Sequence, residues 1–120
     1  MAQDRWEISQ EGGRAVITVP GGLDIASSDR LGQAVAAALH ADAAEVIVDT
    51  SRAARCGLGG IAALVSARRS AEAAGAALSV VAGPAVRQTM NFTGPVTRGL
   101  LPQTLAPAAA RPRQARGTRQ

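Results

Sequence analysis

The sequence predicts a small α/β domain in the order ββαβαβα, in which an antiparallel N-terminal hairpin precedes parallel βαβ units and helices pack on the sheet. Three observations predict it. Two stretches near the N-terminus alternate apolar and polar residues around a Gly-Gly pair. Two later stretches, residues 45–49 and 77–82, are short and rich in Val, Ile and Leu. Amphipathic helix patterns separate them, and strands joined by single helices pair in parallel through right-handed crossovers.

The predicted hairpin joins residues 6–10 to residues 15–19, both of which alternate in polarity. Gly12-Gly13 between them suits a two-residue turn, because glycine tolerates a positive φ at either position. Pro20-Gly21-Gly22 then ends the second strand.

The first helix is predicted to begin at Ser27 or Ser28, either of which could act as its N-cap, and to end near His40. Leu31, Val35 and Leu39 then share one face. The strand that follows, residues 45–49, has three consecutive β-branched apolar residues, which is typical of a central strand buried on both faces.

The second helix is predicted over about residues 60–74, with Ile61, Leu64 and Val65 buried and Gly75 as its C-terminal stop.

After the strand at 77–82, Gly83-Pro84 opens a short third helix, in which Val86, Met90 and Phe92 are expected to face inward.

The C-terminal part is predicted to leave the fold. Prolines after Gly94 forbid a long helix, and Leu100-Leu101 is a candidate for a last short strand. We expect one domain over residues 1–106 and a disordered, Arg-rich tail over residues 107–120. The whole net charge of +4 comes from Arg111, Arg113, Arg116 and Arg119. Such a tail can touch nucleic acid weakly, but without aromatic residues for base stacking, nucleic-acid binding is not the expected function.

Composition excludes several other classes. No run approaches the roughly 18–20 apolar residues of a membrane span, and the N-terminus lacks the apolar core of a signal peptide. The single Cys56 excludes an internal disulfide and favours a reducing, cytoplasmic setting. His40 and Cys56 are separated by a helix and a strand, and no Gly-x-Ser-x-Gly elbow or P-loop is present. We therefore predict no enzyme, no cofactor and no metal.

Residues 57–60, Gly57-Leu58-Gly59-Gly60, form the corner between a strand and the second helix. Such corners expose the backbone N–H groups of the first helical turn and are natural places for a polar switch. This one offers no hydroxyl, carboxylate, thiol or imidazole. Whatever it does depends on backbone shape and one Leu side chain.

The ordered series of motifs resembles the STAS domain family, the fold of bacterial anti-sigma factor antagonists, over roughly residues 6–105. Gly21-Gly-Leu-Asp24 is similar to the family's Gly-Glu-Leu-Asp segment, and Val46-Ile-Val-Asp-Thr-Ser51 to its strand ending in Val-Asp-Leu-Ser. Gly60-Ile-Ala-Ala-Leu64 falls on the start of the family's second helix, and residues 86–94 follow in register.

The departures from the family's pattern concern its switch. The corner usually reads Asp-Ser-Ser/Thr-Gly, and its first Ser is phosphorylated by the partner kinase. Leu58 occupies that position here, and only Gly60 of the motif is kept. Gly22 replaces the family's Glu, and Arg55 stands where an apolar residue is usual.

The resemblance implies a cytoplasmic protein-interaction module for regulation of transcription, which binds a kinase-type anti-sigma factor or related regulator without phosphorylation at Leu58. The alternative is a phosphorylation-dead STAS subunit of a larger signalling or lipid-transport complex. The expected partner-binding residues come from the corner and its surroundings: Asp24, Arg55, Gly57, Leu58, Gly59 and Gly60.

Several interpretations stay open. Leu58 either docks a partner, with the neighbouring glycines allowing another backbone to approach, or folds back onto the sheet in a loop that binds nothing. Asp24 either caps the next helix or contacts a partner. Cys56 is a core-edge residue or a redox sensor, and His40 either favours the helix dipole or binds a metal.

Overall fold

A computed structural model of the chain describes residues 5–94 and 103–104, and it confirms the predicted α/β fold. One sheet has the strand order β1-β2-β4-β6-β7. The β1–β2 hairpin is antiparallel, and the remaining neighbours pair in parallel. Gly12 turns the hairpin with a φ of 59°. The strands are β1 (Glu7–Glu11), β2 (Arg14–Thr18), β4 (Glu45–Asp49), β6 (Ala77–Val81) and β7 (Gln103–Thr104).

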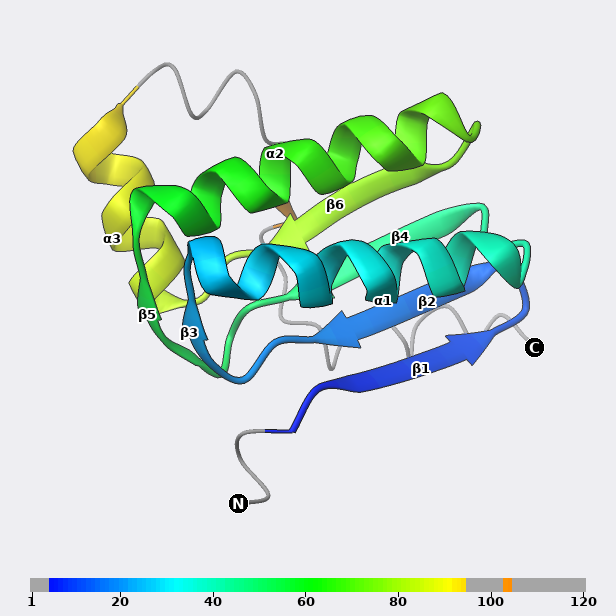
Figure 1. Ribbon diagram of the computed structural model, residues 1–120, viewed down its shortest axis with the longest axis horizontal. Coiled ribbons are helices and arrows are strands. Elements are labelled where there is room, and N and C mark those ends of the chain that lie inside the picture. Colours follow the sequence, from blue (N-terminus) through cyan, green and yellow to red (C-terminus); the bar gives the residue numbers. More distant parts are fainter. Residues whose placement is uncertain (1–4, 95–102, 105–120) are drawn as a thin grey trace.

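Two long helices run side by side across one face of this sheet, as Figure 1 shows. They are α1 (Ser28–His40) and α2 (Leu58–Ala73). The shorter α3 (Pro84–Thr93) packs against the end of the molecule where α2 begins. No helix among the described residues is long and apolar enough to cross a membrane.

The core lies between the two long helices and the sheet. Alternate strand residues such as Ile17, Val48 and Val80 meet Val35 of α1 and Leu64 of α2, and all five are at most 1% exposed. The strand β4 is buried on both faces, as its β-branched run predicts, because Val46, Ile47 and Val48 are consecutive buried residues. The scaffold is therefore a rigid platform for the segments at its edge.

A second, two-stranded parallel sheet was not predicted. It pairs β3 (Gly21–Leu23) with β5 (Ala53–Cys56) at one end of the molecule. Glycine and alanine have low strand propensity, so neither segment has a local signal for a strand. Tertiary pairing forms these strands instead.

The start of α2 differs from the prediction, whereas α1 begins at Ser28, as predicted. The helix α2 begins at Leu58 rather than at residue 60, since the Gly57 carbonyl accepts bonds from the N–H groups of Gly60 (3.0 Å) and Ile61 (3.2 Å). A 3₁₀ turn, η2 (Ile25–Ser27), precedes α1. Ser27 occupies the N-cap position of α1 but makes no side-chain cap bond there.

The prediction for the third helix was wrong at one residue. Val86 and Met90 are buried, but Phe92 is 90% exposed. Val86 and Met90 lie four positions apart on one helix face, whereas a residue two positions further on turns to the other side.

The residue after α2 agrees with the predicted end of this helix. Gly75 follows α2 with a φ of 83°, as a helix stop requires. The strand predicted at Leu100-Leu101 and the boundary predicted after residue 106 both lie outside the described residues.

Candidate functional site

The corner is built from two adjacent strands that each lead into a helix. The strand β3 continues into η2, and its parallel neighbour β5 continues through Gly57 into α2. The N–H of Gly57 donates to the Leu23 carbonyl at 3.1 Å, and this bond joins the C-terminal ends of the two strands. Gly57 has extended backbone angles, and no side chain caps the helix. The first turn of α2 therefore stands at the surface beside η2.

Leu58, the first residue of α2, points into solvent. Its side chain is 64% exposed, so the interpretation in which it folds back onto the sheet is wrong. Ile25 of η2 is 78% exposed. It lies close to Leu58, because Gly59, the next residue of α2, packs against the backbone of Ile25. We call Ile25 and Leu58 together the corner patch. Sequence reasoning missed Ile25, since an isolated apolar residue after a turn carries no periodic signal.

Two of the corner glycines are needed by the chain's own packing. A β-carbon on Gly59 would lie 2.9 Å from the Ile25 nitrogen, and one on Gly60 would lie 2.8 Å from the Leu23 carbonyl carbon. Gly57 alone has open space around it. Gly59 and Gly60 therefore admit η2 and β3 of the chain itself, and of the two glycines beside Leu58 only Gly57 leaves open space for the backbone of another molecule.

Asp24 caps the 3₁₀ turn. Its carboxylate accepts from the backbone N–H of Ser27 at 3.2 Å, and the Asp24 N–H donates to the Ser27 hydroxyl at 3.3 Å. The Ser27 hydroxyl also donates to the Gly22 carbonyl at 2.9 Å. These bonds form a capping box that fixes the direction in which Ile25 is presented. Asp24 stays exposed, so capping leaves its carboxylate accessible.

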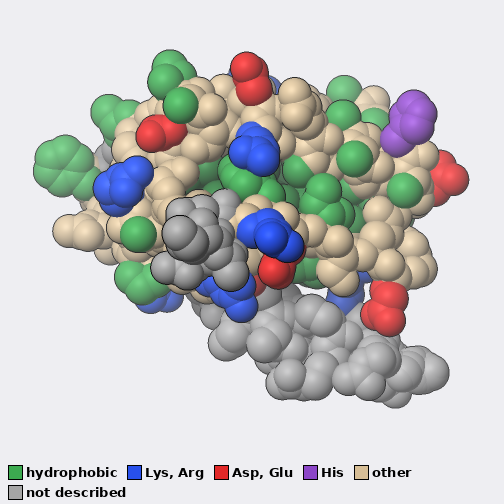
Figure 2. Space-filling model, turned by 60° about the horizontal axis from the view of Figure 1, so that its bottom comes forward, with side chains coloured by type: hydrophobic (Ala, Val, Ile, Leu, Met, Phe, Trp, Pro, Cys, Tyr) green, Lys and Arg blue, Asp and Glu red, His purple; other side chains and the backbone are tan. Residues whose placement is uncertain are grey.

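Two residues near the corner, Gly22 and Arg55, meet in space. Gly22 and Arg55 pair across the β3–β5 ladder, and the Arg55 guanidinium lies over Gly22. Arg52 is exposed in the turn before β5. No described carboxylate forms an ion pair with Arg52 or Arg55. In Figure 2 arginine and hydrophobic side chains are mixed at the left end of the molecule, where β3, β5 and α3 lie.

A buried threonine holds α3 in place behind the corner. Thr50 is fully buried; its hydroxyl donates to the Val81 carbonyl at 2.7 Å and accepts from the Gly83 N–H at 3.1 Å. Gly83 is the N-cap of α3. The hydroxyl thus joins the end of β4 to the β6–α3 junction. It is satisfied on both sides and closed to solvent, so it is a structural group and not an accessible phosphate acceptor.

Cys56 is half-buried at the end of β5. Desolvation by burial raises the pKa of its thiol, and a hydrogen bond with Thr89 of α3 opposes that rise. The Thr89 hydroxyl donates to the Cys56 carbonyl at 2.6 Å. A raised pKa keeps the thiol protonated at neutral pH and makes it a weak nucleophile. The geometry favours the core-edge interpretation.

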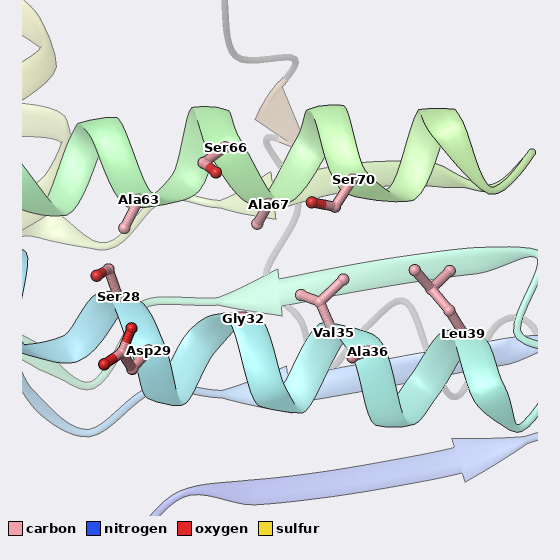
Figure 3. A pocket seen from close by; sticks show the side chains of 10 residues that line it. All are labelled: Ser28, Asp29, Gly32, Val35, Ala36, Leu39, Ala63, Ser66, Ala67 and Ser70. Carbon is pink, nitrogen blue, oxygen red and sulfur yellow. The ribbon is translucent and has the colours of Figure 1, made fainter.

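A groove of about 290 Å³ lies between α1 and α2 on the outer side of the molecule (Figure 3). Its floor is apolar, with Val35 and Leu39 on one side and Ala63 and Ala67 on the other. The hydroxyls of Ser66 and Ser70 and the carboxylate of Asp29 stand along it. The residues that line it include no histidine, lysine or cysteine.

The described part of the chain holds no group of three His, Cys, Asp or Glu side chains that could bind a metal ion. His40 is exposed in the last turn of α1, where a basic group interacts favourably with the helix dipole.

The corner can offer shape, an apolar patch and positive charge to another molecule.

Comparison with known proteins gives a family and a fold. The family model described as "Mlab, STAS domain" matches residues 6–102. No curated protein matches the chain.

Solved structures that share the fold include the following three. An anti-sigma factor antagonist from Mycobacterium paratuberculosis is 23% identical, with a TM-score of 0.69, and 85% of this chain covers 86% of it. The anti-sigma factor antagonist SpoIIAA in its unphosphorylated form is 16% identical, with a TM-score of 0.66. The match covers 94% of this chain and 99% of SpoIIAA. A substitution variant of RsbS from Moorella thermoacetica is 19% identical, with a TM-score of 0.68. The match covers 97% of this chain and 99% of the RsbS chain.

Proposed function

The chain belongs to the STAS domain family, and from that premise we propose that it is a protein-interaction module of the anti-sigma factor antagonist kind. It binds a kinase-type anti-sigma factor or a related regulator through the corner, in the cytoplasm and without catalysing a reaction. Asp24, Arg55 and Gly57–Gly60 form the contact region around Leu58. Two of the solved structures that share the fold are named as anti-sigma factor antagonists, which supports the class of function.

One observation carries the proposal: Leu58, which the resemblance places at the family's phosphoacceptor position, is exposed. Exposed large apolar side chains are common singly, but two close together on rigid segments favour an interaction site. Leu58 begins a helix anchored to β3, and Ile25 is fixed by the Asp24 capping box. The corner patch therefore needs little ordering on binding, which lowers the entropic cost of association.

The chemistry of the corner defines the partner. Ile25 and Leu58 fit a shallow apolar hollow, and the exposed Arg52 and Arg55 favour acidic side chains around it. Phosphorylation of a corner Ser would add about −1.5 to −2 charges at this site. Leu58 has no hydroxyl, so that charge cannot be added there, and binding stays constitutive with respect to this switch.

The test is a calorimetric titration of the full chain with the kinase-type anti-sigma factors of the same cell. Leu58→Asp is expected to weaken binding at least tenfold, which corresponds to about 1.4 kcal/mol, because it places a charge in the apolar hollow. Ile8→Asp is the matched control, since Ile8 is also an exposed apolar residue (48%) but lies on β1. Equal affinity for the wild type and Leu58→Asp would remove the corner from the interface.

A second experiment separates constitutive binding from a hidden switch. After incubation with the partner kinase and ATP, peptides covering residues 52–64 of the wild type should carry no phosphate in mass spectrometry. Leu58→Ser restores a hydroxyl at the same exposed position and should become phosphorylated and lose affinity in the presence of ATP. Phosphate on the wild-type peptides would contradict the proposal.

Co-purification tests the class of partner. A stable, stoichiometric partner other than an anti-sigma factor would favour the alternative function, a phosphorylation-dead subunit of a larger signalling or lipid-transport complex. If no anti-sigma factor binds, the proposed function is wrong, whatever the corner contacts.

A further inference from the structure

The second face of the main sheet carries an apolar cluster that no described helix covers. The cluster consists of Ile47 and Val81, with Val16 packed against them, and it is separate from the main core. Both long helices lie on the opposite face (Figure 1). We call this surface, made by the alternate residues of β1, β2, β4 and β6 that turn away from the helices, the far face.

The burial of the far face requires a cover. Ile47 is 2% exposed and Val81 is 5% exposed, as low as many residues of the main core. Parallel sheets occur almost only with both faces covered, whereas an antiparallel sheet can leave one face in water. The strands β2, β4, β6 and β7 pair in parallel and only the edge pair β1–β2 is antiparallel, so the cluster lies on the parallel part of the sheet.

Charge surrounds this cluster asymmetrically. By strand register, Glu7 and Glu11 of β1 and Glu45 and Asp49 of β4 share the far face. Arg14 is the one basic residue of β1, β2, β4 and β6 that shares it, and it pairs with Glu45 at 3.0 Å. Four carboxylates against one guanidinium give the far face a negative potential around an apolar centre.

We propose that the chain's own C-terminal residues 105–120 are the cover. They contain Arg111, Arg113, Arg116 and Arg119 and no Asp or Glu, so their charge is complementary to the far face. Leu105 and the Ala and Pro residues supply apolar contact. Prolines have no backbone N–H to leave unsatisfied on a sheet surface.

The geometry of the chain makes this docking short and direct. The strand β7 ends at Thr104, which is paired with Val81, so the segment starts at the border of the apolar cluster. Sixteen extended residues reach roughly 50 Å, and five strands span only about 20 Å. The segment can therefore cross the whole far face as far as β1.

A paramagnetic label tests the proposal in the full chain. In a Cys56→Ala background, Gly117→Cys carries a nitroxide, and the amide signals of Val16, Ile47 and Val81 are expected to lose intensity. Signals of Ala36 and Ser66 on the helix side serve as internal controls and should keep theirs. Replacing the four tail arginines by Gln, or adding salt, should restore the far-face signals, because screening weakens exposed charge pairs.

The same label distinguishes the other possible covers. Mixing isotope-labelled chain without nitroxide and nitroxide-bearing chain without isotope label reveals contacts between molecules. Signal loss on the far face in that mixture alone would assign the cover to a second copy and overturn the proposal. Unchanged intensities on the far face in both samples would overturn it as well. None of these outcomes depends on a partner of the corner.

Discussion

The guanidinium of Arg55 lies over the bare α-carbon of Gly22. A β-carbon added at residue 22 would come 3.0 Å from the Arg55 Cζ and closer still to one guanidinium nitrogen. The two residues are neighbours across the β3–β5 ladder. The absence of a side chain at position 22 leaves the space that the long, basic side chain at position 55 fills.

This relationship predicts energetic coupling between the two positions. In an Arg55→Ala background, Gly22→Ala should stabilise the chain by about 0.4–1 kcal/mol, because it restricts the unfolded state. With Arg55 present, the new methyl group displaces the guanidinium and forces the side chain away from its preferred rotamer, at about 0.5–1.5 kcal/mol. Urea unfolding of the four chains of this cycle gives the coupling energy directly. Strict additivity would show that Arg55 does not occupy that space in solution.

The glycines of the corner are predicted to differ sharply in their tolerance of a side chain. Gly60→Ala drives a methyl group into the Leu23 carbonyl, a backbone group that cannot move aside, and should destabilise the fold by about 1–3 kcal/mol or more. Gly57→Ala is the matched control: it meets open space and has no positive φ, so its effect should stay within about 0.5 kcal/mol. Thermal unfolding monitored by circular dichroism compares the two. Equal effects would mean that α2 does not approach β3 as closely as described.

Much of the fold could be predicted because its strands and helices have strong local patterns. The run Val46-Ile47-Val48 marks a central strand by its side chains alone, and Leu31 and Val35 mark the buried face of α1. The β3–β5 pair could not be predicted in this way. Its residues are mostly glycine and alanine, and the strands form only because β2 and β4 deliver them side by side.

The candidate site, too, could be predicted only in part. The resemblance predicts that Leu58 lies at the phosphoacceptor position, but it does not predict whether the side chain is exposed. Ile25 was missed because its exposure is set by the Asp24 capping box and by contact with Gly59, neither of which leaves a periodic trace. The Gly22–Arg55 relationship joins residues far apart in the chain and depends on the unpredicted ladder.

The hydroxyl of Thr50 is predicted to be needed for stability, since it serves two backbone groups in a fully buried place. Thr50→Val keeps the shape but leaves the Gly83 N–H without its acceptor, which should reduce the free energy of unfolding by about 1–3 kcal/mol. Thr50→Ser keeps the hydroxyl and should lose less than the valine variant. Urea unfolding measures both. If Thr50→Ser lost more stability than Thr50→Val, the methyl group of Thr50, and not its hydrogen bonds, would be what stabilises the fold.

The thiol of Cys56 is predicted to react slowly at neutral pH. Burial raises its pKa above the usual 9.0, and this outweighs the opposing hydrogen bond with Thr89, so less thiolate is present than in an exposed cysteine. Alkylation by iodoacetamide should be slower than for Ala54→Cys in a Cys56→Ala background, which carries its thiol at an exposed position of the same strand. Equal rates for the two thiols would contradict the burial of Cys56.

The same shift has a consequence for stability, whose sign follows from linkage. A group with a raised pKa in the folded chain binds its proton more tightly there than in the unfolded chain. Its contribution is therefore complete below the ordinary pKa and is lost as the pH rises through the folded value, above 9.0. The unfolding free energy of the wild type should fall more steeply in that alkaline range than that of Cys56→Ala, as urea titrations at several pH values would measure. Parallel curves for the two chains would mean that the thiol titrates alike in both states.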